Sequence, residues 1–296
     1  MNINIRPLAF GLGAEVTGIS IDKPLDSEAT KMIRKAWIQY QVLVFPDAEI
    51  SSAQHIKFSK EFGELEVHPF KHWRGAEHPE IIEVTNRAID GKKSETADVG
   101  RKWHSDGAYT LRPPTGSLLH CRAIPRAGGT TWFTNMYMAY DTLSEAMKAV
   151  IEKLEVVNDV GIANYLKARS TIQSAEHARD NPAVVQPMVL QHPESGRKAL
   201  YLNETVTRRI SGMSDEESAG LLQYLFRHSA RAEFIYRHSW KLNDLVMWDN
   251  RCTMHLAPAD YAPDEIRQMY RTTLLGEPRG RLEQANSRSA QAPGEA

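Results

Sequence analysis

Two residues near one third of the chain could together bind a metal ion. His104 and Asp106 stand two positions apart in the segment Trp103-His104-Ser105-Asp106. Residues i and i+2 of an extended strand point to the same face, so this spacing predicts an imidazole and a carboxylate side by side. The pair taken alone carries little weight, because a His-x-Asp sequence also occurs by chance in many proteins.

His255 is the candidate for a third ligand. It follows the apolar segment 244–248 and the turn-forming pair Asp249-Asn250, a position suited to projecting into the mouth of a barrel. Two histidines and one carboxylate form a facial triad, which leaves three corners of an octahedron open for substrate and dioxygen. Judged alone, His255 could equally be an ordinary core or surface histidine.

The two cysteines do not favour a structural zinc site. Such a site has four protein ligands, usually including cysteine, whereas neither Cys121 nor Cys252 has a partner at CxxC spacing. Two cysteines are also too few for a disulfide framework, which fits a reducing compartment.

Two arginines downstream could bind an anion. Arg267 and Arg271 are four residues apart, and both can reach one cavity if the segment is helical or runs into a strand. The planar guanidinium fork pairs well with carboxylates and sulfonates. The alternative is a pair of solvated surface arginines.

The composition is that of a globular protein in the cytoplasm. Of 296 residues, 42% are hydrophobic and 25% charged, with a net charge of −1, which argues against a general nucleic-acid binder. No apolar run reaches the roughly 18 residues of a membrane span, so no membrane association is expected. The N-terminus shows no basic segment followed by an apolar stretch, so no export signal is expected.

Many short apolar segments, about ten residues apart and separated by Gly and Pro, predict a mainly β fold with flanking helices and a jelly-roll (double-stranded β-helix) core. Helices are expected from Ser27, from Ser51 or Ser52, over 141–153, and after the capping box at Ser214. The polar segment 164–182 is a candidate lid. We expect one domain over residues 1–280 and a disordered tail over 281–296.

Several segments, taken in order, resemble the taurine dioxygenase and 2,4-dichlorophenoxyacetate dioxygenase family of Fe(II)- and 2-oxoglutarate-dependent oxygenases. The resemblance covers nearly the whole chain. The segments that define it most specifically are Trp103–Asp106, Gly128-Gly129-Thr130-Thr131, Trp248-Asp249-Asn250-Arg251 followed by His255, and Arg267 with Arg271-Thr272-Thr273.

The resemblance implies a role for each candidate residue. It makes His104, Asp106 and His255 the ligands of Fe(II). Thr131 and Arg267 match the residues that bind the cosubstrate 2-oxoglutarate. Arg271 and His68 match residues that meet the anionic group of the substrate. Because related halogenases have a small residue in place of Asp106, the carboxylate predicts hydroxylation with dioxygen.

The predicted activity is therefore hydroxylation of a small anionic substrate, either a sulfonate or an aryloxy or alkyl carboxylate, often followed by fragmentation to an aldehyde or ketone. Alternatives are desaturation or cyclisation at the same iron centre in a biosynthetic pathway, a non-catalytic cupin-like anion-binding protein, and a divalent-metal hydrolase. The resemblance also implies a homo-oligomer, a dimer or tetramer.

One departure bears on the substrate. Gly100 stands where taurine-specific members place an asparagine that touches the substrate, so taurine is disfavoured. The spacing from His255 to Arg267 and the segments 234–238 and 244–251 are closer to the aryloxyacid branch.

Overall fold

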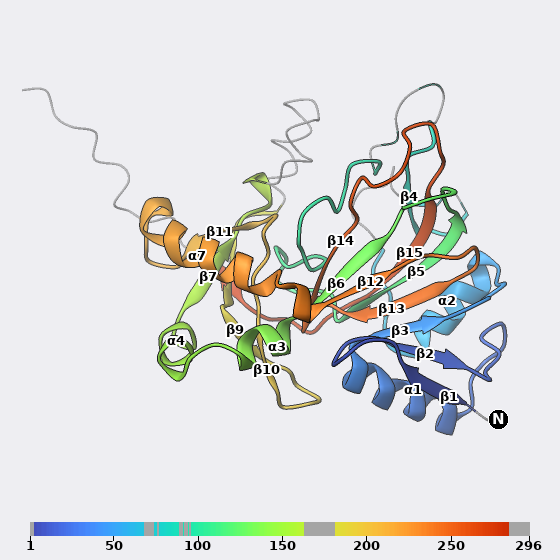
Figure 1. Ribbon diagram of the computed structural model, residues 1–296, viewed down its shortest axis with the longest axis horizontal. Coiled ribbons are helices and arrows are strands. Elements are labelled where there is room, and N and C mark those ends of the chain that lie inside the picture. The colour runs from blue at the N-terminus through green and yellow to red at the C-terminus, as the bar shows by residue number, and fades with distance from the viewer. Residues whose placement is uncertain are drawn as a thin grey trace, which may run out of the picture.

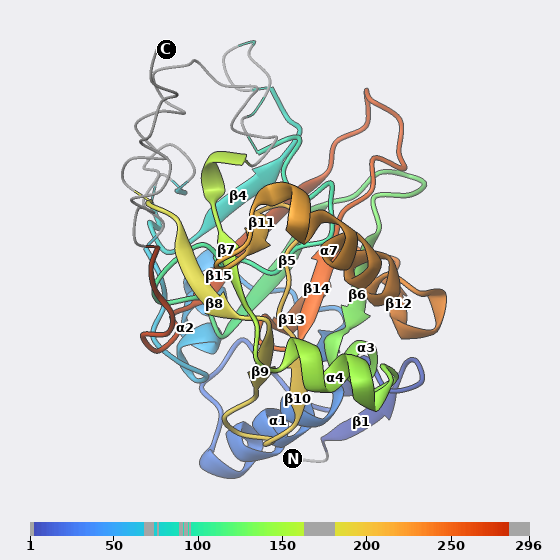
Figure 2. The ribbon, with the colours of Figure 1, turned by 90° about the vertical axis from the view of Figure 1, so that its left-hand side faces the viewer.

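The described part of the chain consists mainly of β-strands with helices around them (Figures 1 and 2), as the sequence predicts. The computed structural model describes residues 3–67, 74–75, 77–88, 91, 94, 96–162 and 181–283.

The largest sheet has seven strands in the order β1-β2-β3-β13-β5-β15-β4. They are β1 (Asn4–Pro7), β2 (Ala14–Thr17), β3 (Val42–Phe45), β13 (Leu245–Asp249), β5 (Gly116–Ala123), β15 (Gln268–Leu274) and β4 (Ile82–Thr85). Three smaller sheets have the orders β12-β6-β14, β11-β7-β8-β16 and β10-β9. Their strands are β12 (Ile235–His238), β6 (Thr131–Asn135), β14 (Thr253–Leu256), β11 (Thr207–Ile210), β7 (Glu155–Asn158), β8 (Val184–Pro187), β16 (Arg281–Leu282), β10 (Lys198–Leu200) and β9 (Val189–Gln191).

The two faces of the seven-stranded sheet bury different apolar layers. On β13, Leu245 and Met247 belong to the cluster that includes α1 and α2, whereas Val246 and Trp248 join the cluster around Phe133 of β6. This is the period of two expected for a strand buried on both faces. The layer around Phe133 lies between the seven-stranded and three-stranded sheets, and the cavity described below opens beside it.

The helices begin where the sequence places capping residues. They are α1 (Ser27–Tyr40), α2 (Ser52–Lys60), α3 (Met136–Asp141), α4 (Glu145–Ile151) and α7 (Asp215–Ser229), with short 3-10 turns η2 (Val160–Ile162) and η3 (Ala232–Phe234). Ser51 and Ser214 each form a complete capping box, and the Asp26 side chain caps α1.

The helix predicted over 141–153 is confirmed in part: it is α4, which covers only Glu145–Ile151 because Ser144 caps it. A separate helix, α3, precedes it, is capped by Asn135 and ends at Asp141. The Asn135 side chain accepts the amide hydrogens of Tyr137 and Met138, so the first helix starts five residues earlier than the predicted one.

The ordered chain extends past the domain boundary predicted at residue 280. Arg281 and Leu282 form β16, which pairs with Val185 and Val184 of β8. Arg281 also forms an ion pair of 2.6 Å with Glu155, so backbone pairing and charge together hold this segment. Residues 284–296, the rest of the predicted tail, lie outside the described residues.

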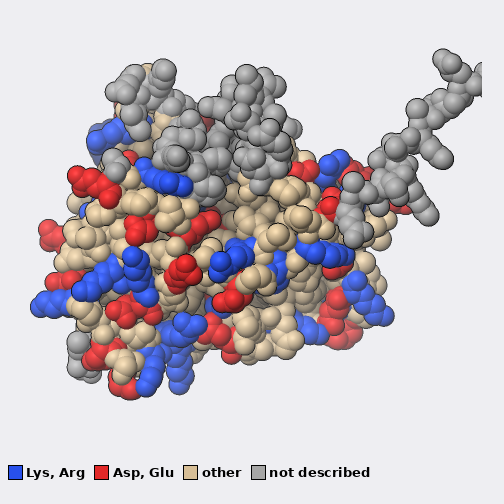
Figure 3. Space-filling model, turned by 180° about the vertical axis from the view of Figure 1, so that it is seen from behind, with Lys and Arg blue, Asp and Glu red and all other residues tan. Residues whose placement is uncertain are grey.

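Two further observations concern the surface. Within the described residues, no helix has the length and apolar character needed to cross a bilayer. On the face drawn in Figure 3, acidic and basic side chains are interspersed, in line with the near-zero net charge.

The candidate lid, 164–182, lies almost entirely outside the described residues.

Candidate active site

The predicted site residues gather around one cavity of about 150 Å³. The cavity is bounded by the inner faces of β5, β13 and β15 and by β6 and β14. Of the residues selected from the sequence, its walls contain His104, Asp106, Thr131, His255, Arg267 and Arg271. His68 lies outside the described residues.

His104, Asp106 and His255 converge at this cavity. Their ligand-type atoms all lie within 4.8 Å of one another. His255 is on β14, and its backbone exchanges two hydrogen bonds with that of His104, at 2.7 and 3.0 Å. The backbone pairing thus joins two segments that are about 150 residues apart in the sequence. It brings the imidazole rings of His104 and His255 together, with their centroids 4.1 Å apart.

The backbone around His104 differs from the extended strand that the sequence predicts. The only ladder contact there is the bridge between His104 and His255, and Asp106 already belongs to a turn. The chain turns because Gly107 adopts a φ of +58°, in the left-handed region that favours glycine. Asp106 reaches the histidines from this turn rather than from the same face of a strand.

The Asp106 carboxylate is held by a closed set of hydrogen bonds. Ser117 Oγ donates to Asp106 Oδ2 at 2.6 Å and accepts from Asn250 Nδ2 at 3.0 Å. Asn250 Oδ1 in turn accepts from the Asp106 amide at 3.2 Å and from Trp248 Nε1 at 2.9 Å. Arg271 Nη1 donates to Asp106 Oδ1 at 2.7 Å. The orientation of the carboxylate is therefore fixed by Ser117 of β5 and Arg271 of β15, with Asn250 of the turn after β13 holding Ser117 and the Asp106 amide.

Burial and charge set the protonation of the three groups. Burial lowers the pKa of both His104 and His255, and the neighbouring His104 lowers that of His255 further. Burial acts against ionisation of Asp106, but Arg271, then the two histidines and the Ser117 hydrogen bond, outweigh it and hold the pKa of this carboxyl well below its usual range. At neutral pH the site holds two neutral imidazoles and one carboxylate.

This donor set fits a divalent metal of the non-haem iron type. His104 Nδ1 donates to the Lys102 carbonyl at 2.8 Å, so Nε2 of the neutral ring has the free lone pair. His255 Nδ1 is buried and has no hydrogen-bond partner among the described residues. Neutral imidazole and carboxylate are the donors of the facial triad, and three further positions stay open to other ligands.

Arg267 places a buried positive charge at the same cavity. Its Nη2 donates to Thr131 Oγ1 at 3.1 Å and its Nε to the Gly129 carbonyl at 2.9 Å. Burial lowers the pKa of Arg267 to about 10, so the guanidinium is still charged at neutral pH. Among the described residues no carboxylate forms an ion pair with it, and Trp240 Nε1 donates to the same Thr131 hydroxyl at 2.9 Å. A buried guanidinium with this surrounding is suited to a carboxylate ligand.

Gly100 also lines the cavity, in the left-handed conformation with a φ of +74°. A Cβ atom at this position would lie 3.3 Å from His104 Cε1. A larger residue here would therefore be strained and would press on the His104 ring, so the backbone at this position favours glycine.

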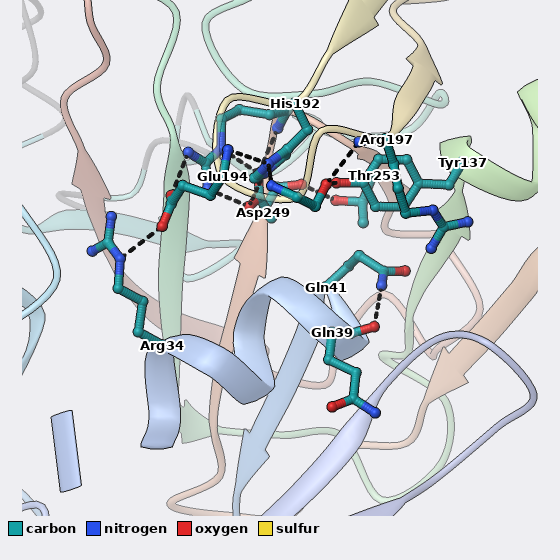
Figure 4. Close-up of polar contacts among 11 residues, drawn as sticks. Arg34, Gln39, Gln41, Tyr137, His192, Glu194, Arg197, Asp249 and Thr253 are labelled. Atoms are coloured by element: carbon teal, nitrogen blue, oxygen red, sulfur yellow. Dashed lines mark hydrogen bonds and ion pairs between the residues drawn. The ribbon is translucent and has the colours of Figure 1, made fainter. Parts of the chain in front are cut away.

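A second polar cluster lies at the start of the turn between β13 and β14, around Asp249 and His192 (Figure 4). The Asp249 carboxylate accepts four hydrogen bonds: three from Arg251, of which one is from its backbone amide, and one from His192 Nε2 at 3.0 Å. Arg251 Nη1 also donates to Glu194 Oε1 at 2.9 Å. The other oxygen of Glu194 accepts a hydrogen bond from Arg34 Nε of α1 at 2.7 Å. This network fixes the turn between β13 and β14, which carries Asn250.

His192, Asp249 and Cys252 could by distance alone hold a metal, since their ligand atoms also lie within 4.8 Å of one another. Both oxygens of Asp249 are already occupied by the four donors. Burial raises the pKa of the Cys252 thiol well above its usual range, so it is protonated. We interpret this cluster as a support for the turn and not as a metal site.

Sequence reasoning missed Ser117 and Asn250 as functional residues. Ser117 has no local signal, because its partner Asn250 is 133 residues away. Asn250 belongs to the segment Trp248-Asp249-Asn250-Arg251, which contributes to the family resemblance. Only the fold shows that its side chain accepts a hydrogen bond from the Asp106 amide.

The geometry agrees with three comparisons with known proteins. The family described as "Taurine catabolism dioxygenase TauD, TfdA family" matches residues 4–273. The chain is 32% identical over 290 residues to the (S)-phenoxypropionate/α-ketoglutarate dioxygenase of Sphingobium herbicidovorans, covering 93% of this chain and 96% of the relative. It is 30% identical over 290 residues to the α-ketoglutarate-dependent 2,4-dichlorophenoxyacetate dioxygenase of a Burkholderia species, with coverages of 93% and 95%.

A solved structure leads to the same family. The crystal structure of AAD-2 in complex with Mn(II) and N-oxalylglycine superposes with a TM-score of 0.83 at 34% identity, covering 96% of this chain and 100% of that one. The matched span, the identities and the arrangement of the site lead to one conclusion: the chain belongs to the TauD, TfdA family of dioxygenases.

Proposed function

We propose that this chain oxidises a small organic anion, with His104, Asp106 and His255 as ligands of Fe(II). As a member of its family it is an oxidoreductase that uses 2-oxoglutarate and dioxygen. The observation that carries the residue assignment is that an ionised carboxylate and two neutral imidazoles meet in the cavity that also contains the buried Arg267, whose guanidinium has no carboxylate partner among the described residues. When bound, Fe(II) and 2-oxoglutarate would activate dioxygen, which is the oxidant that breaks a substrate C–H bond while 2-oxoglutarate is oxidised to succinate and carbon dioxide.

The chain's own residues would orient the reactants. Arg267 and the Thr131 hydroxyl would bind the distal carboxylate of 2-oxoglutarate, because they present a charged fork and a hydroxyl side by side. Ser117 and Asn250 would hold Asp106 in one orientation, and the apolar walls at Ile82, Val84 and Leu119 would exclude water.

Arg271 would bind the anionic group of the substrate. Its guanidinium lines the cavity, and its Nε is buried without a partner among the described residues. The phenoxypropionate and dichlorophenoxyacetate activities of the relatives point to an aryloxy or alkyl carboxylate, and a sulfonate fits the same guanidinium. Hydroxylation next to an ether oxygen or a sulfonate gives a product that fragments to an aldehyde or ketone.

The proposal also includes a jelly-roll core, a single domain and a homo-oligomeric assembly. The two facing sheets support a single jelly-roll domain that includes residues 1–280 and ends at or beyond residue 283. A homodimer or homotetramer and a cytoplasmic location stay predictions.

The direct test is succinate release from 2-oxoglutarate by the Fe(II)-loaded protein with a panel of sulfonates, aryloxyacids, alkyl carboxylates and sulfate esters. We expect an anionic compound to stimulate succinate formation only when dioxygen is present, and its product to gain one oxygen atom or to appear as fragments. A product that lacks two hydrogens would instead indicate desaturation. Turnover without dioxygen would indicate a hydrolase, and binding without any succinate a non-catalytic binding protein.

Replacing Ser117 by alanine should weaken metal binding by about 10- to 100-fold, as is typical when a partner of a metal ligand is lost. Ser117→Ala removes the hydroxyl that donates to Asp106 Oδ2 and leaves Asn250 Nδ2 without its acceptor. The measurement is calorimetric titration with Mn(II). Ser59→Ala is the matched control, because Ser59 is an equally buried serine whose hydroxyl contacts Thr272, outside the cavity. Wild-type affinity in Ser117→Ala would remove this residue from the support of the site.

A further inference from the structure

Glu66 places a second carboxylate at the cavity. The segment around it runs antiparallel to the end of β15: the Glu66 amide donates to the Thr273 carbonyl at 2.8 Å, and the Leu275 amide donates to the Glu64 carbonyl at 2.8 Å. Leu65 forms the bridge with Leu274 between these two bonds. Glu66 therefore stands opposite Thr273 and, like it, lines the cavity.

The register brings Glu66 close to Arg271. Arg271 and Thr273 are two residues apart on β15 and share the face that lines the cavity. A residue opposite Thr273 is a diagonal neighbour of Arg271, at a backbone separation of about 7–8 Å that long side chains can span. One carboxylate and one guanidinium thus stand side by side in the cavity wall.

Polar atoms at this end of the cavity lack partners. Arg271 Nε and Thr273 Oγ1 are both buried, and neither forms a hydrogen bond with a described residue. Among the described residues, the Glu66 carboxylate forms no ion pair or hydrogen bond either. Burial raises the pKa of Glu66, and Arg271 opposes this rise. Buried polar groups are normally satisfied, so these atoms are suited to a ligand with complementary polar groups.

We propose that Glu66 is a specificity-determining residue, which together with Arg271 selects substrates that carry a hydrogen-bond donor, an ammonium or a hydroxyl group, next to their anionic group. This inference rests on the proposed function, in which Arg271 binds the substrate anion. A simple carboxylate bound to Arg271 would place a second negative charge close to Glu66. A 2-amino or 2-hydroxy acid instead offers the carboxylate to Arg271 and the donor to Glu66, with its apolar part against Ile82, Val84 and Leu119.

The test uses hexanoate, 2-aminohexanoate and 2-hydroxyhexanoate, which differ only at the carbon next to the carboxylate. Their dissociation constants are measured by calorimetry on the Fe(II)- and 2-oxoglutarate-loaded protein without oxygen. We expect the wild type to bind the amino or hydroxy acid at least about tenfold more tightly than hexanoate, the effect of one hydrogen bond to a charged group.

Three variants separate charge recognition from a structural role. Glu66→Gln should lose the preference for 2-aminohexanoate and bind hexanoate more tightly, because it no longer repels a plain anion. Glu66→Asp keeps the charge and should keep the preference for the ammonium group. Glu64→Gln, which changes an exposed carboxylate of the same segment, should behave as the wild type.

Equal affinity ratios in the wild type and Glu66→Gln, or no binding of any of the three acids, would overturn the inference. The proposed function has a separate readout. Succinate formation stimulated by hexanoate, equal in both proteins, would remove Glu66 as a determinant but leave the dioxygenase assignment intact. Failure to bind metal and 2-oxoglutarate at all would reject both.

Discussion

Replacement of Asp106 by alanine is expected to lower metal affinity and succinate formation by more than about 100-fold, beyond the effect of losing a supporting residue. Asp106 is the only anionic member of the proposed ligand set, so its loss leaves two neutral imidazoles to hold a divalent ion. In the wild type, Arg271 Nη1 lies 2.7 Å from the Asp106 carboxylate. The loss of Asp106 removes this partner and leaves the largely buried, positively charged guanidinium close to the metal position. Both consequences oppose metal binding.

Calorimetric titration with Mn(II) and a succinate assay measure this effect. Asp106→Asn keeps the shape of the side chain but removes its charge, and should show a similar loss. Asp141→Ala changes an exposed carboxylate of α3 and should leave both quantities unchanged. Wild-type metal affinity in Asp106→Ala would show that the metal, if any, binds elsewhere.

The second large effect is expected at the cosubstrate site. Arg267→Ala should raise the KM for 2-oxoglutarate by about 10- to 100-fold, because a hydrogen-bonded pair of opposite charges is lost. The KM of the prime substrate should change little, since Arg271 and not Arg267 is assigned to it. Steady-state kinetics with each substrate varied in turn measure the two constants.

Arg267→Lys should restore only part of the affinity, because an ammonium group cannot reproduce the fork that reaches both the Gly129 carbonyl and Thr131. Arg126→Ala, at an exposed arginine in the loop before β6, is the control. An unchanged KM for 2-oxoglutarate in Arg267→Ala would remove this residue from the cosubstrate site.

The side chains of the site were easier to predict than the backbone that holds them. Residue type and spacing make His104, Asp106 and His255 candidates, the family resemblance implies that they are the ligands, and in the structure their ligand atoms lie within 4.8 Å of one another. The predicted strand under His104 and Asp106 is only one bridge, because Gly107 turns the chain immediately after Asp106. That glycine is visible in the sequence, but residue spacing alone does not show that it adopts the left-handed conformation.

The supporting contacts could not be predicted because they join distant parts of the chain. Trp240 reaches Thr131 across 109 residues, and Asn250 reaches Ser117 across 133. Serine and asparagine are common polar residues, and nothing near Ser117 distinguishes it. Glu66 is similar, since its position at the cavity follows from the pairing of its segment with β15.

The helix over 141–153 was misread for a different reason. The apolar residues Leu143, Met147, Val150 and Ile151 follow helical spacing, which favoured one continuous helix. Asn135 and Ser144 are both typical N-cap residues: Asn135 starts the separate helix α3, which ends at Asp141, and Ser144 starts α4 four residues after the predicted start. Here the capping signals were present in the sequence, and the apolar spacing was given too much weight.

The central claim is that one metal ion binds between His104, Asp106 and His255. The most direct test is anomalous diffraction from crystals grown with Mn(II) and N-oxalylglycine, the pair bound in the AAD-2 structure. We expect a single strong manganese peak within bonding distance of these three side chains, with the carboxylate of the inhibitor at Arg267. A peak at other residues, or none at this cavity in crystals that contain the metal, would contradict it.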